Sequence, residues 1–224
     1  MIPIGILKRL KMFAVVLAIG LLSVFVLSCG GSSGGGGDDD DDQSLTITGE
    51  SGNQVDMNGT WKSNCVNDID EGESETTSLT VSGSTFTHTG NQWWDDLNCP
   101  GTSDVTTKIV GTIVLGDDVT VDKNGSDVTA TELDGVFSSY VATCNSAAVA
   151  DDLNDEKACG FDNWAVGVPK DILGLDCQQD SDFKDVMYVD DTVDPDAWYG
   201  GDDDDLDANG YPTELELDSV QYRM

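Results

Sequence analysis

The sequence predicts an all-β domain, an antiparallel meander interrupted by an irregular, partly helical insertion. Two observations support this fold class. Short runs rich in Thr and Val alternate between apolar and polar residues, and turn residues separate them at hairpin spacing. Residues 144–182 break the alternation and mark the insertion. Hairpin-connected strands pair antiparallel, because parallel pairs need long crossovers.

Two hairpins are predicted before the insertion. The runs 78–82 and 85–89 are joined by the two residues Gly83-Ser84. The runs 119–121 and 128–131 flank Asn124-Gly125, and this dipeptide supplies the positive φ that a tight hairpin turn needs.

Further strands are expected from strict alternation. Residues 106–115 place one apolar set on one face and a second set on the other: Ile109, Gly111, Ile113 and Leu115 against Val110, Thr112 and Val114. Strands are also expected at 185–189, at 198–199 and at 213–223. In the last of these, Leu215 and Leu217 would point inward and the acidic residues between them outward.

The insertion is expected to contain short helices and a disulfide. Residues 146–153 predict one helix, and residues 162–172 a second one that Pro169 disfavours. Five cysteines follow Cys29. Cys65 and Cys99 flank the first hairpin region and are expected to pair, and Cys159–Cys177 is the preferred second pair, which leaves Cys144 over.

The first 28 residues have the parts of a secretory signal. A basic head with Lys8, Arg9 and Lys11 precedes an apolar run, residues 12–27. Residues 26–29, Val-Leu-Ser-Cys, resemble the bacterial lipobox, which implies cleavage before Cys29 and acylation of its thiol. The alternative is an uncleaved transmembrane anchor, since about 17–25 apolar residues span a bilayer.

Residues 29–54 are expected to form a flexible Gly/Ser/Asp tether behind the acylated Cys29. Glycine and serine give a coil, and the five aspartates 38–42 extend it by repulsion, so residues 30–43 reach roughly 20 Å. Gly30 stands where Asp would mark inner-membrane retention in enterobacterial lipoproteins. The resemblance therefore implies the outer membrane in the cell envelope, with periplasmic or outward display left open.

The charge balance excludes one class of partner. The chain has 43 acidic residues and a formal net charge of −33, and three of its ten basic residues lie in the signal. With so few cations nothing neutralises phosphates, so nucleic acid is excluded as a partner. This charge has two interpretations. The acidic residues either form a solvated surface or capture cations.

A short motif near the start of the domain and an arginine near its end together resemble a known barrel signature. Gly59-Thr60-Trp61 opens the domain, and Arg223, the sole Arg after the signal, ends its last predicted strand. The pair resembles lipocalins, and residues 59–65 and 210–215 resemble uncharacterised lipocalin-like bacterial lipoproteins. The resemblance implies that residues 55–224 form an antiparallel lipocalin-like β-barrel. Arg223 would then lie over Trp61 at one end, a contact of about 0.5–2 kcal/mol.

One acidic segment fits a calcium-loop pattern. Asp205, Asp207, Asn209, Gly210 and Glu216 have the spacing D-x-[DN]-x-[DN]-G-x5-E, which wraps oxygens round a hard cation. No flanking helices are predicted, and Glu216 falls inside a predicted strand. The alternatives are a looser calcium site formed by Asp203, Asp205, Asp207 and Asn209, and a plain acidic hairpin loop.

Catalytic motifs are not found in the sequence. His88 is the single histidine, no Gly-x-Ser-x-Gly elbow occurs, and Cys144 has no basic neighbour to activate its thiol. A strand histidine satisfied by a neighbour is the expected role of His88. Trp93 and Trp94 either pack on a barrel rim or form an exposed contact for a sugar or partner.

Together these observations indicate a non-catalytic, lipid-anchored envelope protein. Its barrel would either hold a small apolar ligand or be filled by side chains. It would meet the membrane through its anchor, and no motif requires a cofactor, although calcium is an option. The alternative is an acidic, calcium-stabilised module for surface adhesion or interaction. A hydrolase is the third hypothesis.

Overall fold

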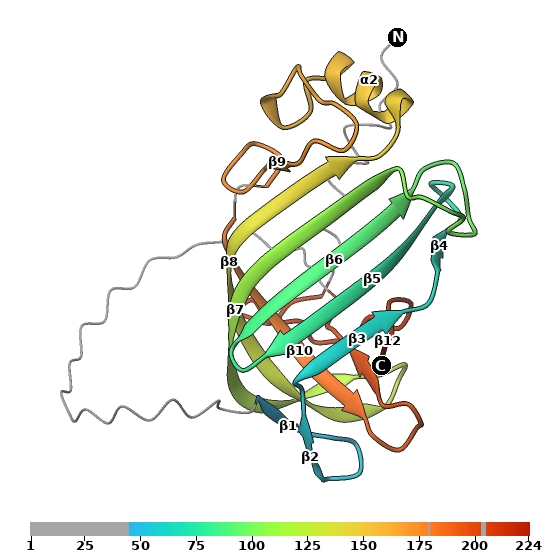
Figure 1. The fold of residues 1–224 in the computed structure, drawn as a ribbon. Coiled ribbons are helices and arrows are strands. Elements are labelled where there is room, and N and C mark those ends of the chain that lie inside the picture. The colour runs from blue at the N-terminus through green and yellow to red at the C-terminus, as the bar shows by residue number, and fades with distance from the viewer. Residues whose placement is uncertain (1–44, 179, 203–204) are drawn as a thin grey trace, which may run out of the picture.

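In a computed structural model that describes residues 45–178, 180–202 and 205–224, the chain forms a closed antiparallel β-barrel of eight strands with a small helical insertion (Figure 1). The predicted fold class is therefore confirmed. The signal, Cys29 and the tether up to residue 44 lie outside the described residues. Within the described ranges, no helix is both long and apolar enough to cross a bilayer.

The barrel strands pair in a single closed ring. β10 pairs with β8 on one side and β11 on the other, and β12 pairs with β3, so neither end of the strand order is left open. Around the ring the strands are β3 (Gly59–Ser63), β5 (Glu73–Ser82), β6 (Thr85–Trp93), β7 (Val105–Asp122), β8 (Asp127–Cys144), β10 (Asp182–Asp190), β11 (Ala197–Tyr199) and β12 (Gln221–Arg223).

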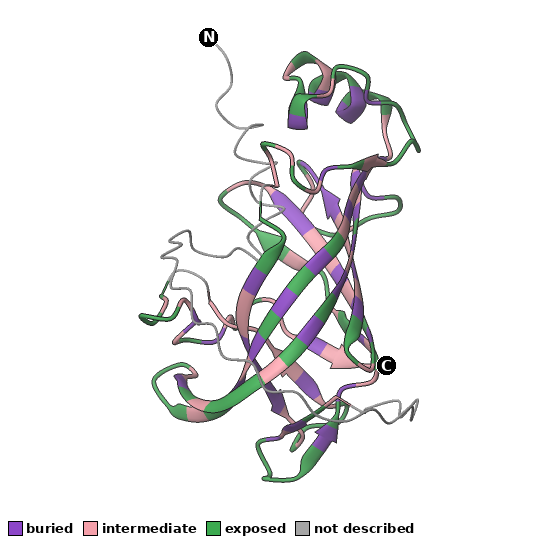
Figure 2. Ribbon diagram, turned by 90° about the vertical axis from the view of Figure 1, so that its left-hand side faces the viewer, coloured by how far each residue is buried: buried purple, intermediate pink, exposed green. Residues whose placement is uncertain are grey.

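The alternation along the strands divides an inner from an outer face. Figure 2 shows buried and exposed residues in turn along the long strands. On β7, Ile109 and Ile113 are 3% and 4% exposed, whereas Val114 on the other face is 66% exposed, as the sequence predicts. Both hairpins also form, and Asn124 and Gly125 have φ of 54° and 82° in the second.

Strands β7 and β8 are longer than the sequence predicts. The two predicted strands at 106–115 and 119–121 are parts of β7, which continues through a register shift between Leu115 and Asp118. The predicted run 128–131 is only the beginning of β8. The outer part of this long hairpin extends past the barrel ring and packs on the outer face of β10.

β10 is consequently buried on both faces. Phe183, Met187 and Val189 belong to the main core, whereas Val186 and Tyr188 belong to a second core. The second core is completed by residues from the β7–β8 hairpin and from the segment before β12: Val121, Ala130, Tyr211 and Leu215.

The predicted last strand is wrong over most of its length. Only Gln221–Arg223 forms β12, and Leu217 is 39% exposed. The reason is that residues 213–216 bond elsewhere: Leu215 N–H donates to Asp122 O at 2.9 Å and Glu216 N–H to Gly200 O at 3.0 Å. The alternation around Leu215 reflects burial in the second core and not a barrel strand.

The folded domain begins before the expected boundary at residue 55. β1 (Thr46–Thr48) and β2 (Gln54–Asp56) form a hairpin whose Ile47 and Val55 enter the main core. Glu50 N–H donates to Val189 O at 2.9 Å, which ties the hairpin to β10. Residues 45–54 therefore belong to the domain and not to the predicted tether.

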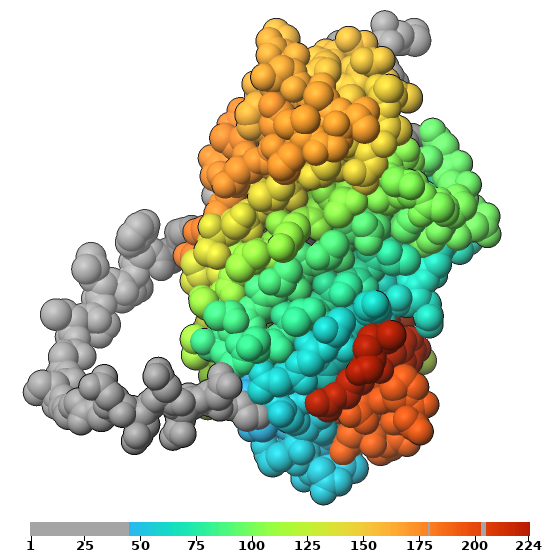
Figure 3. Space-filling view, in the orientation of Figure 1, coloured from blue at the N-terminus to red at the C-terminus, as the bar shows by residue number. Residues whose placement is uncertain are grey.

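The insertion lies at the end of the barrel opposite the β1–β2 hairpin (Figures 1 and 3). Its helix α2 (Ala147–Asp155) begins at Ser146, whose hydroxyl accepts from Val149 N–H, so the first predicted helix is confirmed. The second is wrong: 162–172 holds only the short strand β9 (Lys170–Asp171), which pairs with β8. The 3-10 helix η2 (Ala158–Gly160) carries Cys159, whose disulfide to Cys177 spans the insertion.

The pairing of β8 with β10, here called the seam, brings Gly135 close to the Phe183 ring and gives a stability prediction. Gly135 lies opposite Phe183, and a Cβ on Gly135 would be 2.1 Å from the Phe183 ring. We expect Gly135→Ala to lower the free energy of unfolding by about 1–3 kcal/mol, measured by urea denaturation.

Two variants control this prediction. Adding Phe183→Leu to Gly135→Ala should recover part of the lost stability. Gly200→Ala, whose Cβ would meet nothing nearer than 3.5 Å, should change stability by less than about 0.5 kcal/mol. Equal losses for Gly135→Ala and Gly200→Ala would contradict the assigned packing of the seam.

Candidate ligand cavity

The barrel contains a cavity of about 620 Å³ that opens to solvent at one side. This volume lies in the range of small-molecule sites, about 300–1,000 Å³. Most of its wall is apolar and comes from six strands of the ring: Leu79, Phe86, Ile113, Leu133, Phe183, Met187 and Trp198. The sequence left open whether the barrel is filled or hollow, and this part of the interior is hollow.

The rim of the cavity is formed by two segments. One is β4 (Val66–Asp68) with the turn after it, including the 78% exposed Ile69, and the other is the chain just before β12, with Asp218 and Ser219. The disulfide Cys65–Cys99, with a Cα–Cα distance of 5.9 Å, joins the residue before β4 to the loop after β6. Both predicted disulfide pairs are thus present, and this one holds the rim in place.

His88 projects from β6 into the cavity and has no hydrogen-bond partner on either ring nitrogen among the described residues. It is 5% exposed, and burial lowers the pKa of its imidazole to about 4, so the ring is neutral at pH 7. The sequence-based expectation that a neighbour satisfies this histidine is wrong, because its cross-strand neighbours are Leu79 and Ile109.

Two further polar atoms on the cavity wall have no partner in the described part of the chain. They are Oε1 of Gln221, a residue 2% exposed, and Nε1 of Trp198. The two residues lie opposite each other on β12 and β11. Burying a polar atom without a hydrogen bond costs about 1–3 kcal/mol of folding free energy, and a ligand that forms the missing bond can regain it.

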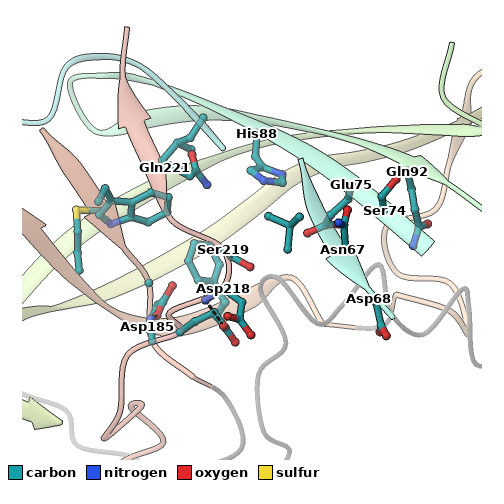
Figure 4. Close-up of a pocket in the computed structure, with 18 of the residues that line it drawn as sticks. Asn67, Asp68, Ser74, Glu75, His88, Gln92, Asp185, Asp218, Ser219 and Gln221 are labelled. Atoms are coloured by element: carbon teal, nitrogen blue, oxygen red, sulfur yellow. Dashed lines mark hydrogen bonds between the residues drawn. The ribbon is translucent and has the colours of Figure 1, made fainter. Parts of the chain in front are cut away.

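Acidic side chains also face the cavity. Glu75 on β5 lies opposite Gln92 on β6, and burial raises the pKa of its carboxyl to about 7. Gln92 itself donates from Nε2 to Glu73 Oε2 at 2.8 Å. Figure 4 shows Glu75, His88 and Gln221 arranged around one space, with Asp218 and Ser219 across it.

Trp61 and Arg223 are brought together away from the cavity. The Arg223 guanidinium lies 5.4 Å from the Trp61 ring centroid, and the two residues are register partners on β12 and β3. Trp61 is fully buried and donates from Nε1 to Met57 O at 3.1 Å. Arg223 also pairs with Asp196 at 3.5 Å. The contact between Arg223 and Trp61 that the sequence predicts is therefore present.

The candidate calcium residues form a compact turn. Asp207 Oδ1 accepts from the backbone N–H of Asn209 at 2.7 Å and of Tyr211 at 3.0 Å, so this carboxylate stabilises the loop. Glu216 lines the cavity. Asp203 lies outside the described residues, and in the described ranges no group of three or more acidic, His or Cys side chains is placed to hold a metal.

The remaining candidates are buried. Trp93 and Trp94 are each 8% exposed and donate from Nε1 to Pro100 O and Gln92 Oε1, which favours the packing interpretation. The Cys144 thiol donates to Ala165 O, and burial raises its pKa. Sequence reasoning missed Glu75, Trp198 and Gln221. Glu75 lies outside the predicted strand 78–82, whereas the inward position of a polar residue on the predicted strand 213–223 is the signal that could have found Gln221.

No protein-family model matches this chain, and no curated protein matches its sequence. The fold and the cavity therefore define its class without a relative. It is a closed eight-stranded antiparallel barrel with an interior cavity whose apolar wall carries a few unpartnered polar atoms.

Because the chain has one histidine, its titration can be followed without assignment. In NMR spectra we expect the chemical shifts of the His88 imidazole carbons to keep their neutral-form values from pH 8 to 5. They should then change with a midpoint near pH 4. The unfolded chain takes up this proton first, near pH 6.5, so the folded state loses stability as pH falls from 6.5 toward 4. A midpoint near 6.5 in the folded protein would show that His88 is solvated.

Proposed function

We propose that this protein is a non-catalytic, lipid-anchored envelope protein whose barrel binds a small molecule with a large apolar body. The cavity of about 620 Å³ is the observation that carries the proposal. Apolar concave walls with a few fixed polar groups are typical of ligand sites, since burial supplies affinity and the polar atoms supply orientation.

The wall of this cavity is held in place before any ligand arrives. Phe86 contacts Phe183 edge to face at 5.8 Å between centroids, and Phe137 stacks on Phe183 at 4.8 Å. The rim is fixed by the Cys65–Cys99 disulfide. A preformed site spends little binding free energy on ordering side chains, which favours affinity.

The described residues favour binding over catalysis. The single histidine is neutral, and within the described ranges neither ring nitrogen is hydrogen-bonded, so no carboxylate bonds to it and orients it as a general base. The Cys144 thiol is buried with a raised pKa, which disfavours the thiolate that a nucleophile needs.

Binding in the interior can be tested with neighbouring residues on β7 that face opposite ways. Ile113→Trp would fill the cavity, whereas Val114→Trp would place the same indole on the 66% exposed outer position. With the neutral fluorophore N-phenyl-1-naphthylamine, we expect a fluorescence increase on binding to the unaltered protein and to Val114→Trp. Ile113→Trp should bind about tenfold or more weakly.

Two outcomes would contradict the cavity as a binding site. One is the absence of any fluorescence increase with the folded, unaltered protein. The other is an equal loss in both Trp variants, because then the probe would bind elsewhere. Far-UV circular dichroism of each variant checks that the barrel is retained.

Lipid anchoring is proposed from the sequence and falls on residues outside the described ranges. We expect the protein expressed in a bacterium to incorporate a clickable palmitate analogue and to partition with membranes. Cys29→Ser should abolish both, whereas Cys144→Ser, which changes the buried thiol that lies outside both disulfides, should leave labelling unchanged. Labelling of Cys29→Ser would contradict the anchor, and a cytoplasmic, unlabelled chain would contradict the envelope location.

A further inference from the structure

We propose that the ligand of this cavity is an amphipathic cation, an amine or quaternary ammonium group carried on an apolar chain or ring system. This inference rests on the proposed binding function and adds the charge of the ligand to it. Charge, hydrogen-bonding capacity and the placement of basic residues each support it.

The charges that line the cavity all have one sign. Seven carboxylates border it, and of the described lining residues none is Lys or Arg. They come from β4 and its turn, β5, β10 and the chain before β12: Asp68, Asp70, Glu73, Glu75, Asp185, Glu216 and Asp218. A concave site lined by one sign of charge raises the local concentration of the opposite ion and repels its own.

Three basic residues of the barrel make contacts outside the cavity lining. Lys123 lies over the rings of Tyr188 and Tyr199 and contacts Asp190 at 3.6 Å, and Lys184 lies over Tyr211. Arg223 lies over Trp61 at the structural contact already described. These cations are engaged away from the cavity, and no Lys or Arg is among the described residues that line it.

Two of the unpartnered groups on the wall can accept a hydrogen bond from a ligand, and a third, the Nε1–H of Trp198, can donate one. Gln221 Oε1 is buried without a partner and can only accept, and a neutral imidazole offers one acceptor nitrogen, here on the 5% exposed His88. Glu75 adds a carboxylate at the same wall. An ammonium N–H donates to such groups, and the Trp198 ring offers a face for the cation.

The same carboxylates disfavour the binding of an anionic amphiphile. A fatty acid carboxylate would enter past the acidic rim residues and come to lie beside Glu75, where the described lining residues offer no guanidinium or ammonium to receive it. Like charges at short range in a partly desolvated site disfavour each other strongly. The apolar wall alone would then have to provide all of the binding free energy.

Glu75 makes the preference dependent on pH. Other titratable groups share its surroundings: Glu73 on β5, Asp68 on β4, His88 on β6, Tyr140 on β8, and Asp185, Glu216 and Asp218 across the cavity. Because burial holds the pKa of Glu75 near 7 in the free protein, a bound cation favours its ionised form and releases a proton. Affinity for a permanent cation should therefore rise from pH 6 to pH 8.

Three ten-carbon amphiphiles test the charge of the ligand. Decyltrimethylammonium, decanoate and 1-decanol are each titrated, below their micelle concentrations, against the protein with bound N-phenyl-1-naphthylamine. We expect the cation to displace the probe at a concentration at least about tenfold lower than decanoate does, with the alcohol between them.

The outcomes separate the two proposals. If decanoate displaces the probe as well as the cation does, or if all three are equal, the charge inference is overturned and the binding function stands. If the probe does not bind and none of the three gives heat in calorimetry with the folded protein, both proposals are overturned.

One substitution tests the role of Glu75. We expect Glu75→Gln to weaken decyltrimethylammonium binding about tenfold at pH 8 and to remove most of its pH dependence, with 1-decanol binding unchanged. The matched control is Asp117→Asn, which makes the same charge change at an exposed position on β7 outside the cavity lining. Unchanged 1-decanol binding shows that the variant is folded. Equal effects of both variants, or a retained pH dependence in Glu75→Gln, would overturn the role of this carboxylate.

Discussion

The hydrogen bonding of β10 to β8 on one edge and to β11 on the other is the constraint on which the rest of the structure depends. It closes the sheet, and the cavity has walls from strands at both ends of the strand order only because the sheet is closed. The seam accommodates this pairing by placing Gly135 opposite Phe183, whose ring occupies the space that a side chain on residue 135 would need. β10 is then buried on both faces, since the β7–β8 hairpin and the chain before β12 cover its outside.

The same closure explains why the interior is polar at some positions and apolar at others. A β-strand alternates inward and outward, so residues an even number of positions apart on β5, or on β6, can face the same wall. On β5 these include Glu75 and Leu79, and on β6 Phe86 and His88. A filled core would have apolar residues at all of these places. The unpartnered polar atoms inside the barrel are the ones that the proposed ligand would pair with.

Much of the fold could be predicted because local patterns determine it. The Asn124-Gly125 turn, the alternation along 106–115 and the helix after Ser146 each depend on neighbours in sequence. The cavity could not be predicted, because it depends on which residues of β5 and β6 face β10–β12 across the barrel. The last strand was misassigned for a related reason: Leu215 is buried in a second core that only the long β7–β8 hairpin creates.

The central claim is that small apolar molecules enter the barrel interior, and nuclear Overhauser effects from a bound ligand to assigned methyl groups test it most directly. With N-phenyl-1-naphthylamine bound, ring protons should give cross-peaks to the methyl groups of Leu79, Ile113 and Met187, which line the cavity. They should give none to the methyl groups of Val114 and Val136, which are exposed outside the barrel. Cross-peaks to the outer methyl groups alone would contradict a ligand-binding interior.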